Sequence, residues 1–149
     1  MRLQFEQLAR TAQRELARGL RASRSVRLFG FELDAVEPGR AVVGMKVRAQ
    51  HKQVHGVVHG GILAGLADTA AGLAIYSALP RGTRLATIEM KINYLEPVHQ
   101  GRLLAEARLL RKGRNLAVAA CDVRDTHSRL VATALLTFSI GPVQARRTR

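Results

Sequence analysis

Hydrophobic residues recur along this chain with two different periods. Over residues 2–22 apolar residues return at four-residue steps with arginines between them, which predicts an amphipathic helix. Beyond it the pattern changes to alternation of apolar and polar residues, as in strands with one buried face. We expect strands at about 28–36 and 41–48 before a long apolar segment, and at 86–95, 102–111, 115–124 and 129–140 after it.

The long segment between the second and third predicted strands is apolar on nearly every side. Residues 59–79 predict a helix that ends at Pro80-Arg81-Gly82. Strands on both sides of one central helix predict an α+β domain, with an antiparallel six-stranded sheet wrapped around a long helix and an extra N-terminal helix. One sheet covers only one side of such a helix, so we expect a partner subunit to cover the rest.

The alternation also assigns faces within the strand at 86–95. Ile88 and Met90 are predicted to share one face of this strand with Ile92 and Tyr94. Thr87 is predicted to lie on the opposite face.

The pattern divides the chain into a basic helix at 1–27, the sheet and long helix at 28–140, and a loose basic tail at 141–149. The N-terminus has no apolar run typical of a signal peptide. The long apolar segment carries Asp68 near its middle, where a charge in lipid would be costly. The single cysteine, Cys121, cannot form an intrachain disulfide. We therefore expect a cytoplasmic protein that does not insert into a membrane.

The formal net charge of +13 comes largely from arginines in the first helix and the tail. Such a charge attracts polyanions, including nucleic acid and phosphate-rich cofactors. No nucleic-acid-binding motif accompanies it, so solvated arginine-rich faces are the preferred interpretation, and no nucleic-acid partner is expected.

Two features of the central helix indicate chemistry. Gly60 and Gly61 open the helix, where backbone N–H groups have no intrahelical partner and the dipole is positive. Without Cβ atoms they would let a thioester carbonyl approach these amides, as in an oxyanion hole, although close packing alone also explains a glycine pair. Asp68 is an acidic residue in an apolar helix, which favours a general base or a nucleophile. The alternatives are an ion pair with an arginine, or a hydrogen bond to Thr69 or Thr87.

The spacing of these features has a geometric consequence. Gly60 and Asp68 are eight residues apart, which is roughly 12 Å along one helix axis. One thioester carbon cannot contact both within a single chain. Two antiparallel helices related by a two-fold axis would bring Asp68 of one chain opposite Gly60 of the other, giving an intersubunit site.

The segments Gly56–Gly61, Leu66–Ala70 and 87–97, with Gly101 and Gly113-Arg114, resemble the hotdog-fold thioesterases of the phenylacetic-acid-degradation, PaaI-like type. The resemblance spans roughly residues 28–140. It implies a homodimeric or homotetrameric enzyme that hydrolyses an acyl-CoA thioester to the free acid and coenzyme A. Coenzyme A is then part of the substrate, and no separate cofactor is implied.

The resemblance also implies roles for particular residues. Asp68 would attack the thioester or activate water, Gly60 would donate its N–H to the carbonyl, and Gln53 and His59 would lie near the reacting group. Gln53 departs from the Asn found in some relatives, and Asp68 from the Glu of others. The residues implied in substrate binding are Gly61, Thr69 and Thr87, and, around the nucleotide end of coenzyme A, Arg111, Lys112, Gly113, Arg114, Asn115 and Leu116.

Other functions on the same fold fit the sequence less well. A non-hydrolytic acyl-CoA-binding regulator is the main alternative, and a dehydratase would need a His/Asp pair on a different loop. His51, His55 and His59 repeat at four-residue steps, a metal-ligand spacing on a helix. Gly56 and the neighbouring valines disfavour a helix there, and no cysteine or carboxylate is placed to complete a site, so no metal is expected.

Overall fold

The sheet and the long helix predicted from the sequence are both present. The structure is a computed structural model that describes the backbone of residues 2–143 and the side chains of residues 11 and 13–142. Its elements are α1 (Arg2–Ala22), α2 (Arg24–Phe29), β1 (Phe31–Glu37), β2 (Arg40–Lys46), α3 (Gly60–Ser77), β3 (Thr83–Tyr94), β4 (Arg102–Lys112), β5 (Leu116–Asp125) and β6 (Leu130–Val143).

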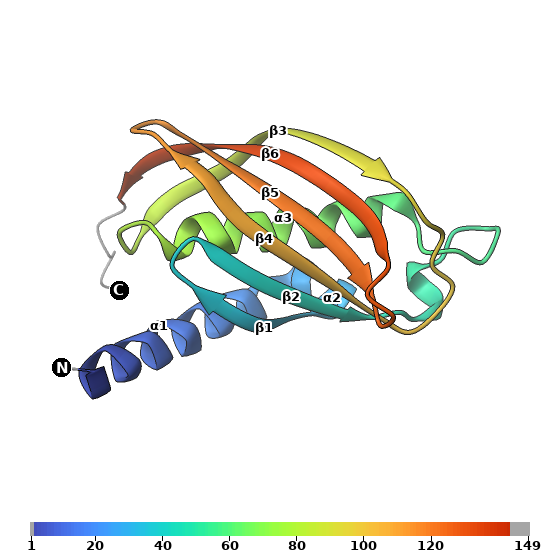
Figure 1. Cartoon of the computed structure of the whole chain (residues 1–149), viewed down its shortest axis with the longest axis horizontal. Coiled ribbons are helices and arrows are strands. Elements are labelled where there is room, and N and C mark those ends of the chain that lie inside the picture. Colours follow the sequence, from blue (N-terminus) through green and yellow to red (C-terminus); the bar gives the residue numbers. More distant parts are fainter. Residues whose placement is uncertain (1, 144–149) are drawn as a thin grey trace.

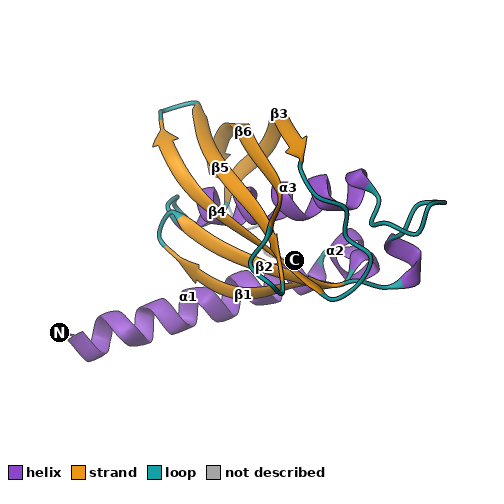
Figure 2. Cartoon of the chain, turned by 45° about the vertical axis from the view of Figure 1, so that its right-hand side comes forward, coloured by secondary structure: helices purple, strands orange, loops and turns teal. Residues whose placement is uncertain are grey.

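The six strands form one antiparallel sheet in the order β1-β2-β4-β5-β6-β3. The sheet curves over α3, and α1 lies along the β1 side of the molecule (Figure 1). Figure 2 shows the same layers from a second direction, with β3 at the edge far from α1. The predicted α+β architecture is therefore confirmed.

Small side chains let the sheet approach α3 closely. Ala67, Ala70, Ala71 and Ala74 on α3 are completely buried, and they face strands whose inward positions are also largely alanine and valine. None of the helices within residues 2–143 has the length and apolarity needed to cross a membrane. The opposite side of α3, which carries Asp68, is only partly covered by this chain.

Some boundaries differ from those predicted. The first helix ends at Ala22 as predicted, but a second short helix, α2, follows it, so the strand expected from residue 28 begins at Phe31. Gly30 ends α2 with a φ of 68°, a conformation that glycine adopts without steric cost. β6 continues to Val143, beyond its predicted end at 140. The rest of the predicted basic tail lies outside the described residues.

A β-bulge in β3 reverses the predicted faces of Thr87 and Ile88. Met90, Ile92 and Tyr94 share one face of the strand, as predicted, because each of them pairs with a buried residue of β6. The pairing of β3 with β6 shifts between Thr87 and Glu89, where one extra residue is inserted. Thr87 pairs with buried Phe138, so it faces α3, while Ile88 is 57% exposed. Strict alternation put these two residues on the wrong faces, because the bulge separates them from Met90 and the following residues by one extra position.

Candidate active site

Asp68 lies in the middle of α3 on its half-covered face. Its Oδ1 accepts a hydrogen bond of 2.7 Å from the Thr87 hydroxyl on β3. Within the described residues Asp68 makes no ion pair, and its Oδ2 has no hydrogen-bond partner. The Thr69 hydroxyl donates instead to the carbonyl of Gly65 at 2.8 Å. Of the partners considered from the sequence, Thr87 is the one that contacts Asp68, and it leaves one carboxylate oxygen available to a ligand.

The N-terminus of α3 is capped by the side chain of His59. His59 Nδ1 accepts a hydrogen bond of 2.9 Å from the Gly61 N–H, so the ring proton of the neutral imidazole is on Nε2. The Gly61 amide is therefore occupied within the chain. The Gly60 N–H, by contrast, has no acceptor among the described residues. Of the two glycine amides, that of Gly60 is the one available to a carbonyl oxygen.

Each glycine also makes room for a specific neighbour. A Cβ on Gly60 would lie 3.1 Å from Cζ of Tyr94, whose hydroxyl donates to the Gly60 carbonyl at 3.0 Å. A Cβ on Gly61 would lie 3.0 Å from Nδ1 of His59. Close packing, the alternative raised from the sequence, thus applies to both positions. Sequence analysis did not identify Tyr94 as part of the site, because it lies far along the chain and only the end of β3 brings it to Gly60.

The loop before α3 is held by a buried histidine. A 3₁₀ turn, Ala49–His51, buries His51, whose Nδ1 accepts from the Arg48 N–H at 3.1 Å. The His51 carbonyl accepts from the His59 N–H at 2.8 Å, which fixes the start of α3. Burial and, next, the charge of Arg48 lower the pKa of His51, while the carbonyl of Phe29 acts in the opposite direction. His51 therefore holds the loop that leads into α3 in place, and its side chain does not line the site.

Gln53 joins the group at this end of α3. Its Oε1 accepts a hydrogen bond of 2.6 Å from the His55 N–H, which shapes the loop tip. Gln53 and Gly60 line a pocket of about 380 Å³ together with Tyr94, Glu96 and neighbouring apolar residues. Asp68 does not line this pocket. The structure thus brings Gln53, His59 and Gly60 together at the N-terminus of α3, and leaves Asp68 roughly 12 Å further along the same helix.

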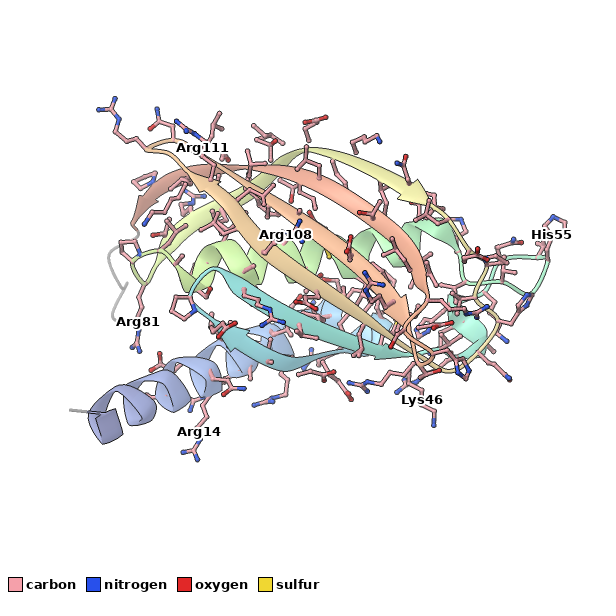
Figure 3. All side chains as sticks on the ribbon, viewed as in Figure 1. Arg14, Lys46, His55, Arg81, Arg108 and Arg111 are labelled. Carbon is pink, nitrogen blue, oxygen red and sulfur yellow. The ribbon has the colours of Figure 1, made fainter. Side chains whose placement is uncertain are left out.

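The hairpin between β4 and β5 lies at the other end of α3. Lys112 Nζ donates to the carbonyl of Ala78, the C-cap of α3, at 3.2 Å, where a cation is favourable to the helix dipole. Figure 3 shows Arg111 on this hairpin and His55 at the opposite end of the molecule. Gly113 N–H donates to the Leu116 carbonyl at 2.8 Å, closing the turn that also carries Asn115. The side chains of Arg111 and Arg114 are exposed and have no partner among the described residues.

Cys121 is removed from this chemistry. It is 1% exposed on the inner face of β5. Burial, followed by the charges of Asp122 and Glu106, raises the pKa of its thiol to about 12. A thiolate nucleophile at Cys121 is therefore excluded near neutral pH.

Comparison with known proteins identifies the family. The Thioesterase superfamily model matches residues 55–132, more than half of the chain. The chain therefore belongs to this superfamily and is a thioester hydrolase. The matched segment contains Asp68, His59 and Gly60, and the predicted class of enzyme is confirmed.

Particular relatives agree with this assignment. The medium/long-chain acyl-CoA thioesterase YigI of Escherichia coli is 29% identical over 130 residues, which cover 77% of this chain and 84% of YigI. The structure of thioesterase HI1161 from Haemophilus influenzae has 29% identity and a TM-score of 0.77, covering 83% of this chain and 87% of that one. The structure of a variant of the phenylacetic acid degradation protein PaaI from Thermus thermophilus has 30% identity and a TM-score of 0.72, covering 78% of this chain and 98% of that one. The predicted hotdog fold and PaaI-like resemblance are confirmed.

Proposed function

We propose that the protein hydrolyses an acyl-CoA thioester to the free acid and coenzyme A. The observation that carries this proposal is the Asp68 carboxylate, which is held by Thr87 through one oxygen while the other has no partner among the described residues. The relative YigI is named as an acyl-CoA thioesterase. The buried thiol of Cys121 suits a reducing compartment, which supports a cytoplasmic location.

The reaction adds water across the thioester bond. The carbonyl carbon is attacked, the C–S bond breaks, and the sulfur leaves with a proton as the thiol. Asp68 either removes the proton from the attacking water or attacks the carbon itself and is then released by water. The Gly60 N–H and the positive end of α3 stabilise the oxyanion. After a single turnover in ¹⁸O-labelled water, label in Asp68 would establish the nucleophilic route, because water can reach that carboxyl group only through a covalent acyl intermediate.

The site that combines these groups is shared between two chains. The roughly 12 Å between Gly60 and Asp68 on α3 is bridged when a partner's helix runs antiparallel beside it. β3 is an edge strand, and Ile88 and Tyr94 on it are 57% and 50% exposed. An exposed apolar edge strand is a natural pairing surface. A homodimer is the smallest assembly that completes the site, and a tetramer would contain two of them. Sedimentation of a monomer at micromolar concentration would contradict this.

The hairpin between β4 and β5 is proposed to bind the phosphates of coenzyme A. Arg111, Lys112 and Arg114 surround the turn glycine Gly113, and guanidinium groups bind phosphate bidentately. The hairpin meets α3 at Ala78, ten residues beyond Asp68, which is roughly 15 Å along the axis. Arg111→Ala combined with Arg114→Ala should raise KM for acyl-CoA and leave turnover of a short thioester without the nucleotide unchanged. Equal losses on both substrates would refute this role.

The decisive test of the function is a screen of acyl-CoA substrates with a free-thiol readout. The wild-type protein should release coenzyme A, and Asp68→Asn should fold normally but lose nearly all turnover. The amide preserves volume while removing the charge and most of the basicity. Binding of acyl-CoA without turnover by the wild type would favour the regulator, and near-wild-type kcat in Asp68→Asn would refute the catalytic assignment.

A further inference from the structure

Two hydroxyl groups of β3 contact the two parts of α3 that the proposed reaction uses. The Thr87 hydroxyl donates to Asp68 in the middle of α3 at 2.7 Å. The Tyr94 hydroxyl, at the last residue of β3, donates to the carbonyl of Gly60 at 3.0 Å. The end of β3 and the start of α3 lie at the same end of the molecule (Figure 1). The strand that reaches Asp68 through one hydroxyl therefore reaches the helix start through another.

The peptide group between Gly60 and Gly61 is held at both of its polar ends. Its carbonyl, on Gly60, accepts the hydrogen bond from Tyr94. Its N–H, on Gly61, donates to Nδ1 of His59 at 2.9 Å. Side chains from two separate parts of the chain therefore fix the orientation of this one peptide group.

The preceding peptide group carries the Gly60 N–H. Its carbonyl, on His59, accepts from the Ile62 N–H at 2.9 Å. The N–H and C=O of a trans peptide point in opposite directions, so the Gly60 N–H points away from the helix. The two peptide groups meet at the Cα of Gly60, and glycine populates backbone conformations that other residues do not. The direction of the Gly60 N–H is therefore well defined only if both peptide groups are held.

The ring of Tyr94 also accounts for glycine at position 60. A Cβ on Gly60 would lie 3.1 Å from Cζ of Tyr94 and 3.3 Å from its hydroxyl oxygen, closer than ordinary van der Waals contact. A side chain at position 60 would push the hydroxyl away from the carbonyl to which it donates. Glycine thus admits the tyrosine, and the tyrosine restrains the peptide group that glycine leaves free to turn.

We propose that Tyr94 is a positioning residue, which holds the Gly60–Gly61 peptide group so that the Gly60 N–H points at the thioester oxygen. The inference rests on the proposed function, in which that N–H stabilises the oxyanion. A donor that is fixed before the reaction needs no reorganisation while charge develops on the oxygen. Because the oxygen is most negative in the transition state, the hydroxyl of Tyr94 should affect kcat rather than KM.

The test removes the hydroxyl and keeps the ring. In Tyr94→Phe we expect kcat for an acyl-CoA to fall about tenfold, with KM within about twofold of the wild type. Tyr76→Phe is the matched control, because Tyr76 is the other tyrosine of the chain and its hydroxyl accepts from the Gly82 N–H at 3.0 Å. This control should keep the wild-type kcat. A wild-type kcat in Tyr94→Phe, an equal fall in Tyr76→Phe, or a rise in KM without a fall in kcat would each overturn the proposal.

Hydrogen exchange of the Gly61 amide tests the positioning without any reaction. Gly60-Gly61 is the one Gly-Gly pair in the sequence, so labelling glycine with ¹³C at the carbonyl and with ¹⁵N selects this amide in an NMR spectrum. In Tyr94→Phe it should exchange with water at least about threefold faster than in the wild type, and in Tyr76→Phe at the wild-type rate.

The exchange measurement also separates this proposal from the proposed function. If the wild type hydrolyses no thioester, faster exchange in Tyr94→Phe still supports the hold of Tyr94 on this peptide group, and the proposed function alone fails. If the wild type is an active thioesterase but exchange is unchanged in Tyr94→Phe, the positioning role is wrong while the function stands.

Discussion

Mixing two inactive variants tests whether each site is built from two chains. Asp68→Asn removes the carboxylate, and Gln53→Ala alters the end of α3 that carries Gly60. On one helix the two ends of the site are roughly 12 Å apart, a distance that an aspartate side chain does not bridge. If Asp68 works with the partner's Gln53 and Gly60, a mixed dimer has one site with both lesions and one with neither.

The expected recovery follows from random exchange of subunits. Equal amounts of Asp68→Asn and Gln53→Ala chains give about half mixed dimers, each with one intact site in two, so activity should reach roughly a quarter of wild type. A site within one chain predicts no recovery. Wild-type chains mixed with chains carrying both substitutions give the complementary control, since a shared site predicts about a quarter of wild-type activity and a within-chain site about half.

The assay is release of coenzyme A followed with a thiol reagent, after exchange has been demonstrated by co-purification of differently tagged chains. Each variant is measured alone first, because Gln53→Ala must itself be impaired. If tagged subunits exchange and the mixture of single variants stays at the activity of its parents, the intersubunit site is wrong.

Three further predictions concern single residues. Thr87→Val should lower kcat/KM about tenfold, equivalent to about 1.4 kcal/mol, because it removes the hydrogen bond that orients Asp68. Thr87→Ser keeps the hydroxyl and should keep most of the wild-type kcat/KM. A wild-type kcat/KM in Thr87→Val would refute this positioning role. Folding lowers the pKa of His51 from 6.5, so the unfolded chain binds its proton more tightly and the free energy of unfolding should fall as the pH drops below about 6.5. Urea titrations from pH 7.5 to 5.5 should show this fall. If the free energy of unfolding of His51→Gln depends on pH as strongly as that of the wild type, His51 is not its cause. Cys121, with a pKa raised to about 12 by burial, should resist iodoacetamide in the folded protein and react in urea; rapid labelling without urea would show that it is accessible.

The sequence by itself determined the elements and the main chemistry-bearing positions. Alternation located most of the strands and the apolar run located α3, because the period of hydrophobic residues reflects which face of each element is buried. Asp68 was identifiable because a carboxylate in an apolar helix is unfavourable without a partner or a function. Gly60 was identifiable because it begins that helix, where backbone amides lack partners.

Tertiary structure alone decided how these positions meet. The bulge in β3 turns Thr87 toward Asp68, and a bulge depends on how two strands pair over some 50 residues of sequence separation rather than on local alternation. Tyr94 packs against Gly60 only because the sheet wraps around α3. A contact between two distant segments leaves no mark on the hydrophobic period of either segment. Hydrophobic pattern therefore predicted the layers of this protein, while side-chain packing between them set the surroundings of Asp68.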